Sequence, residues 1–201
     1  MKLKKLLAAV TTGVLAVTSL SLSGLVSSAE VQELMNDTFE SGYGAWKGVG
    51  SSLSLSTEQS HSGGTSLYCY DRTASWGAPR CSLTGIVAAG QSYEISASAM
   101  YEGSGQQNMA IKMIYTDANG TDHYDQVAAA QATAGQWVEM KGNYTVPNGA
   151  TGMILYVEMS NAGTDQTYYI DDVVIKGEKT EIQLDDKFES DFDNNSTQKW
   201  N

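Results

Sequence analysis

MILYVEMS, residues Met153–Ser160, is a stretch in which every second side chain is apolar. Successive side chains of a β-strand point to opposite faces of the sheet. The apolar set, which includes Leu155 and Val157, would therefore face a core. Tyr156 and Glu158 would then lie side by side on the opposite, exposed face of the same strand.

The same alternation recurs along the chain from Met35 to Lys176. Turn-forming sequences such as SGG (62–64) and PNG (147–149) separate the runs. The alanine-rich run Val127–Ala134 would suit a helix in isolation, but its flanking strands leave it little room. This pattern predicts an all-β fold, a jelly-roll β-sandwich of about ten antiparallel strands. Besides Met153–Ser160, the expected strands include Leu53–Thr57, Thr65–Tyr70, Tyr93–Ala99, Ala110–Thr116, His123–Ala128, Trp137–Val146 and Tyr168–Lys176.

The first 29 residues have the order of a secretory signal peptide. A basic start with Lys2, Lys4 and Lys5 precedes an uncharged stretch to Ser28, and Ala29 ends a short run of small residues. A membrane anchor is the alternative, because the uncharged stretch is long enough to span a bilayer. Cleavage after residue 29 is the favoured interpretation, and it predicts a secreted, extracellular protein that keeps no membrane segment.

The chain is acidic, with 12 basic and 23 acidic residues and a net charge of −11. Loss of residues 1–29 removes three lysines and no acid, which makes the net charge −14. Nucleic acid and anionic membranes would repel such a protein, so neither is an expected partner. Residues 30–176 are long enough to form one domain with a single buried core.

Cys69 and Cys81 flank a segment centred on Ser75, as two positions facing each other across a hairpin would. In an exported protein they could form a disulfide. They could equally be two small buried side chains on one face of a sheet.

The C-terminal end suggests further domains. Residues 177–184 are polar and lack periodicity, as a linker would. DDKFES at 185–190 then resembles NDTFES at 36–41, so residues 185–201 would begin a second, truncated copy of the domain. Chance similarity over so few residues is the alternative. If the repeat is real, covalently linked domains follow this segment.

The sequence contains no recognisable catalytic motif, so this segment is not expected to be an enzyme. The two histidines, His61 and His123, fit neither a catalytic triad nor a zinc-ligand spacing. Asp171 and Asp172 are adjacent on an expected strand and should point to opposite faces. They would then be unable to form the carboxylate pair of a glycosidase. Pairs that include Glu158 are left open, although no feature favours them.

Exposed aromatic side chains point instead to sugar binding. An aromatic ring can stack on the C–H face of a sugar while a neighbouring carboxylate accepts hydrogen bonds from its hydroxyls. Tyr156 and Glu158 offer this combination. Trp76 lies in the polar loop DRTASWG (71–77), where core packing alone explains a tryptophan poorly. Taken singly, each aromatic could instead be a rim residue that shields the core.

Motifs spread over residues 35–176 together resemble a family 22 carbohydrate-binding module. They are FESG (39–42) with Trp46, HSGGTSL (61–67), RTASW (72–76), AGQW (134–137), YTVP (144–147), YVE (156–158) and YIDDV (169–173). Modules of this family share a jelly roll with families 4 and 9 and are commonly attached to xylanases. The resemblance implies that Trp76, Tyr124, Tyr156 and Glu158 contact the sugar, in a cleft on the concave sheet.

Two more expectations come from this resemblance. The family usually carries a ligand-contacting arginine after the first tryptophan, where this sequence has Val49. Lys47 would replace it only in part, because a lysine lacks the planar fork of arginine. The resemblance also implies a structural calcium that joins the first and last strands, with Glu40 and Asp171 as candidate ligands and Asp172 next. The alternative for these acids is ordinary solvated surface.

The predicted function is therefore that of a non-catalytic accessory module. It would bind β-1,4-xylan, or a mixed-linkage β-glucan, and hold an attached glycoside hydrolase such as an endo-1,4-β-xylanase on its substrate. A structural or adhesive cell-surface spacer without glycan binding is one alternative. A small glycoside hydrolase on a jelly roll is the other.

Overall fold

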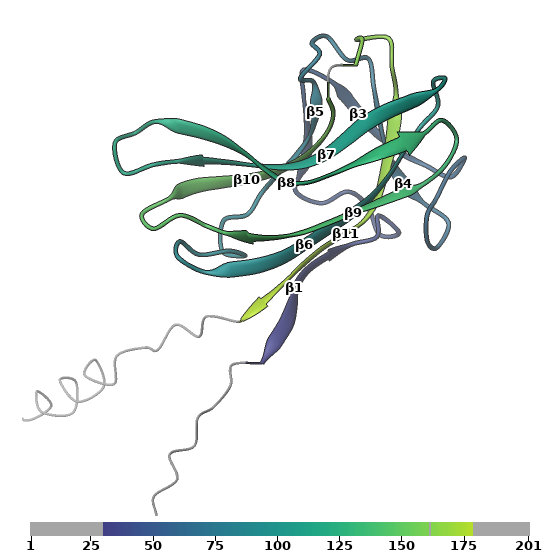
Figure 1. Ribbon diagram of the computed structural model, residues 1–201. Helices are drawn as coiled ribbons and strands as arrows, with labels where there is room; N and C mark the ends of the chain where they lie inside the picture. The colour runs from purple at the N-terminus through teal and green to yellow at the C-terminus, as the bar shows by residue number, and fades with distance from the viewer. Residues whose placement is uncertain (1–29, 161, 179–201) are drawn as a thin grey trace, which may run out of the picture.

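The computed structural model describes residues 30–160 and 162–178, which form eleven strands in two layers (Figure 1). The strands are β1 (Val31–Asp37), β2 (Trp46–Val49), β3 (Ser52–Ser56), β4 (Ser66–Tyr70), β5 (Ala78–Ser82), β6 (Ser92–Tyr101), β7 (Gln106–Thr116), β8 (Asp122–Thr133), β9 (Val138–Thr145), β10 (Thr151–Met159) and β11 (Tyr168–Glu178). None of the described segments is a helix long and apolar enough to cross a membrane.

The strands pair antiparallel throughout, in a six-stranded and a five-stranded sheet. The six-stranded sheet has the order β3-β4-β11-β6-β9, with β1 also pairing with β11. The five-stranded sheet has the order β2-β5-β10-β7-β8. The first and last strands thus lie side by side, as Figure 1 shows. The predicted antiparallel β-sandwich is confirmed.

The core fills the space between the sheets with the side chains that the alternation assigned to it. Leu155 and Val157 of β10 are fully buried there, in one cluster with Ile95 and Ala97 of β6 from the other sheet. Trp46 closes one end of this core, and its Nε1 donates a hydrogen bond to Asp37 Oδ2 at 2.6 Å. Burial of apolar surface on both inner faces therefore fixes which face of each strand is left outside.

Strand boundaries differ from the sequence-based expectation at several points. The alanine-rich run after Val127 continues β8 to Thr133, because it stays hydrogen-bonded to β7 in the ladder. Strands β1, β2 and β5 were not among the expected strands. β11 includes Gly177 and Glu178, the first two residues of the expected linker. The expected signal peptide (1–29), the remainder of the linker (179–184) and the expected second copy (185–201) lie outside the described residues.

The two cysteines are buried free thiols in different sheets. Cys69 lies on β4 of the six-stranded sheet and Cys81 on β5 of the five-stranded sheet, both within the core. Burial raises the pKa of both thiols, that of Cys81 to about 11. The expectation of small buried side chains holds, but the two do not share one sheet face, and the hairpin disulfide is not formed.

A bulge in β11 corrects the expectation for the adjacent acids Asp171 and Asp172. The pairing of β11 with β6 shifts register between Asp171 and Val174, and Asp172 has a φ of 47°. A bulge of this kind turns the strand locally and re-aims its side chains. Both carboxylates therefore contact the same loop instead of opposite faces.

Candidate functional site

A cleft of about 450 Å³ lies on the outer face of the five-stranded sheet. It gathers all four side chains that were predicted to contact sugar, together with two more. Its lining residues are Val49, Trp76, Arg80, Tyr124, Tyr156 and Glu158. They come from β2, the loop before β5, β5 itself, β8 and β10, so the cleft is a product of the sheet order and not of one local motif.

The floor of the cleft follows from strand register. Tyr156 on β10 is paired with Arg80 on β5 and with Lys112 on β7. Paired residues of neighbouring strands share a face of the sheet. Tyr156 also packs with Ala78 and Ile114 in a small apolar cluster that is separate from the main core.

Tyr156 and Glu158 point away from the core, as the alternation predicted, but they are not exposed. Only 4% of Tyr156 and 7% of Glu158 is accessible. The expectation of an exposed pair is therefore wrong in degree. These two residues form the bottom of a hollow whose sides are formed by more exposed side chains.

Burial and neighbouring side chains determine the hydrogen-bonding roles of the two floor residues. Burial, and then the charge of Glu158, raises the pKa of Tyr156 to about 12, so its hydroxyl remains a hydrogen-bond donor at neutral pH. Glu158 Oε1 accepts a hydrogen bond from Ser160 Oγ at 3.0 Å and forms an ion pair with Lys112. The floor thus offers a hydroxyl donor beside a fixed carboxylate acceptor.

Trp76 and Tyr124 form the exposed sides of the cleft. Trp76 is 53% exposed and Tyr124 is 60% exposed, which is unusual for aromatic side chains of this size. Tyr124 is paired in register with Ile114, next to the floor. Two rings that keep much of their surface in water are available to stack on a ligand.

The loop that carries Trp76 is held from below by Arg72, which is buried. Its Nη2 donates to Ser75 O at 2.6 Å, its Nε to Gly77 O at 3.0 Å and its Nη1 to Gly163 O at 2.8 Å. Gly50 supports the ring itself, because a Cβ at this position would lie 2.8 Å from Trp76 Cζ3. Trp76 is therefore presented by a rigid loop although its ring is exposed.

Arg80 is a cleft residue that the sequence reasoning missed. Its Cζ lies 5.7 Å from the centre of the Trp76 ring and 5.3 Å from that of Tyr156. Val49, which stands where an arginine was expected, lines the cleft from the neighbouring strand β2. The sequence signal was weak because β5 is short and contains Pro79, so its alternation was not recognised.

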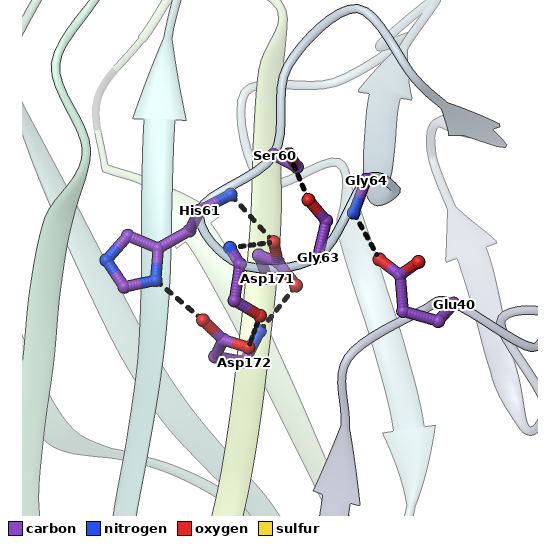
Figure 2. A network of polar contacts seen from close by, with 8 residues as sticks. Glu40, Ser60, His61, Gly63, Gly64, Asp171 and Asp172 are labelled. Atoms are coloured by element: carbon purple, nitrogen blue, oxygen red, sulfur yellow. Dashed lines mark hydrogen bonds and ion pairs between the residues drawn. The ribbon is translucent and has the colours of Figure 1, made fainter.

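The candidate calcium ligands contact one loop from two sides, Glu40 from the turn between β1 and β2 and Asp171 from β11 of the six-stranded sheet (Figure 2). Glu40 Oε1 accepts hydrogen bonds from the backbone N–H groups of Gly64 and Thr65, at 2.9 and 2.8 Å. Asp171 Oδ2 accepts them from His61 and Ser62, at 2.8 and 3.1 Å. Both carboxylates thus hold the turn that joins β3 to β4.

Asp172 completes this network through side chains. Its Oδ1 accepts a hydrogen bond from Ser62 Oγ at 2.6 Å, and its Oδ2 lies 2.6 Å from His61 Nδ1 (Figure 2). Burial raises the pKa of the neighbouring Asp171 carboxyl, which is fully buried. Both acids are therefore tied into the loop between β3 and β4.

Comparison with known proteins identifies the domain. The family model described as "Carbohydrate binding domain", covering families 4 and 9, matches residues 31–165. The structure of the C-terminal family 22 carbohydrate binding module of Clostridium thermocellum Xyn10B is 30% identical, with a TM-score of 0.67. The CBM22-1 xylan-binding domain from Paenibacillus barcinonensis Xyn10C gives the same two values. Each match covers 75% of this chain and 97% of the other.

Longer relatives are xylanases. Endo-1,4-beta-xylanase A of Thermotoga neapolitana is 35% identical over 156 residues, which are 74% of this chain and 14% of that enzyme. Xylanase/beta-glucanase of Ruminococcus flavefaciens is 32% identical over 154 residues, which are 75% of this chain and 19% of that enzyme. The chain thus matches one module of these enzymes. It belongs to the carbohydrate-binding modules, in family 22 of the group formed with families 4 and 9, and its described domain is a binding module rather than a catalytic one.

Proposed function

We propose that this module binds β-1,4-xylan in the cleft formed by Trp76, Tyr124, Tyr156 and Glu158. The observation that carries the proposal is the pair of half-exposed rings on either side of a buried tyrosine and carboxylate. The rings suit the C–H faces of successive sugars, and the floor suits their hydroxyls. The proposal is supported by the relatives, two of which are named as xylanases and one as a xylan-binding domain.

The wider role follows from the position of such modules in longer enzymes. We propose that the module is covalently linked to a glycoside hydrolase, a xylanase, and works outside the cell. A tethered module raises the effective concentration of the enzyme at its polymer without adding catalytic groups. Mixed-linkage β-glucan is a second candidate ligand, favoured by the relative named xylanase/beta-glucanase.

Affinity electrophoresis of the chain tests the choice of polysaccharide. Native gels would contain soluble xylan, mixed-linkage β-glucan or no polysaccharide, with an unrelated protein of similar size as the mobility standard. Retardation in xylan relative to the empty gel is the expected result. Retardation by β-glucan alone would reassign the ligand, and equal mobility in all three gels would contradict glycan binding in this cleft.

We further propose that a calcium ion binds beside the loop between β3 and β4, with Glu40 and Asp171 as ligands. A carboxylate has about four lone-pair sites. Two hydrogen bonds to Glu40 and three to Asp171 leave each carboxylate able to accept a cation. Among the described residues, no group of three or more His, Cys, Asp or Glu side chains is placed so that it could hold a metal ion by itself. Backbone carbonyls, which calcium accepts readily, would therefore have to complete its shell.

A further inference from the structure

We infer that Arg80 forms a carboxylate-binding subsite in the cleft, so that the module prefers xylan carrying uronic acid side groups over unsubstituted xylan. The inference rests on the proposed function, because it concerns a substituent of the same ligand. Of the described residues that line the cleft, Arg80 is the one with a positive charge. No carboxylate of the described domain forms an ion pair with it.

The two neighbouring rings hold the Arg80 guanidinium in place. It lies within 6 Å of the ring centres of both Trp76 and Tyr156, the range of a cation–π contact. Such contacts orient the planar group but leave its charge uncompensated. Arg80 Nε is shielded from solvent and, within the described part of the chain, donates no hydrogen bond. A buried donor without a partner is costly, so the hydrogen-bonding capacity of the Arg80 guanidinium is not fully used within the described domain.

Charge is distributed unevenly over the domain. Residues 30–178 contain only six basic side chains in an acidic protein. Three of them, Lys47, Arg80 and Lys112, lie in one row across the five-stranded sheet, because each is paired in register with a neighbour of the same row. Lys112 is neutralised by Glu158, whereas no such partner compensates Arg80 in the described domain. The cleft therefore keeps a surplus of positive charge.

A neutral polysaccharide can accept hydrogen bonds from the Arg80 guanidinium but cannot compensate its charge, whereas an acidic side group does both. The planar fork of an arginine matches a carboxylate in two parallel hydrogen bonds. The net negative charge of the chain opposes an anionic ligand at long range. Screening limits that opposition to about 8 Å at physiological ionic strength, so the groups next to the carboxylate decide the outcome.

Isothermal titration calorimetry with two oligosaccharides tests the inference. One is xylohexaose, and the other is the same backbone with a single glucuronic acid substituent. The full chain should bind the acidic oligosaccharide about tenfold more tightly, which corresponds to about 1.4 kcal/mol. Arg80→Gln should bring the ratio of the two affinities close to one. Lys176→Gln removes a charge from an exposed position on β11 of the six-stranded sheet and should leave the ratio unchanged.

The ratio is measured on one protein sample, so partial unfolding of a variant cancels out of it. Equal affinities in the unmodified chain would overturn the inference, as would an equal loss for both ligands in Arg80→Gln. Loss of the preference in Lys176→Gln alone would also overturn it. Absence of binding to either oligosaccharide by the unmodified chain would instead refute the proposed function on which it rests.

Discussion

Tyr124→Ala separates ligand binding from folding better than any other change in the cleft. Tyr124 is 60% exposed, and truncation of an exposed side chain changes stability by less than about 0.5 kcal/mol. An aromatic side chain can bury roughly 150–250 Å², so a sugar stacked on one face would cover on the order of 60–80 Å² of it. At about 25 cal/mol per Å², the lost contact amounts to about 1.5–2 kcal/mol. Affinity should fall by about ten- to thirtyfold.

The assay is calorimetric titration with xylohexaose, accompanied by thermal unfolding of the same samples. Leu55→Ala is the matched control, since Leu55 is 41% exposed on β3 of the other sheet. It should leave affinity unchanged. Wild-type affinity in Tyr124→Ala, or an equal loss in Leu55→Ala, would refute the stacking argument.

Three further predictions concern the cleft floor, pH and calcium. Because Tyr156 is buried, Tyr156→Ala should lower the free energy of unfolding, measured in urea, by about 3 kcal/mol and should also weaken ligand binding. Tyr156→Phe should keep the stability of the wild type. Equal unfolding midpoints for wild type and Tyr156→Ala would contradict this. The pKa of Asp117 is lowered from 3.8 to about 2, first by the hydrogen bond from the Thr121 N–H and then by His123. The ionised Asp117 carboxylate therefore stabilises the fold above pH 3.8, and this contribution is lost as the pH falls through 2. The difference in free energy of unfolding between wild type and Asp117→Asn should shrink over that range, and a constant difference would contradict this role of Asp117. If calcium binds the folded state, addition of EDTA should lower the melting temperature of the wild type, and the decrease should be smaller for Glu40→Gln. Identical melting curves of the wild type with and without EDTA would exclude a stabilising ion.

The sandwich was predictable because burial on one face leaves a period-two pattern in the sequence. That pattern is clear in β10, where Leu155 and Val157 face the core and Tyr156 faces the cleft. It fails in β2 and β5, which are four and five residues long and contain Gly48 and Pro79. Strands this short offer too few alternations to be recognised, and the pairing that creates them is non-local.

The site was predictable in its members but not in its depth or its charge. The position of Glu158 at the bottom of the cleft depends on residues far from it in sequence, such as Lys112, with which it forms an ion pair. Arg80 was missed for the same reason, because its place beside Tyr156 comes from strand register. The bulge at Asp172 was also hidden, since a residue with positive φ within a strand has no simple sequence signature when it is not glycine.

Binding of xylan in this cleft is tested most directly by the indole N–H signals in a ¹H–¹⁵N correlation spectrum, recorded while xylohexaose is added. The account predicts a progressive shift of the Trp76 signal, because this ring lines the cleft. The signals of Trp46, buried against Asp37, and of Trp137, which packs edge-on against His61 beside the other sheet, should stay in place. A shift of Trp137 without one of Trp76, or an unchanged spectrum at saturating xylohexaose, would contradict it.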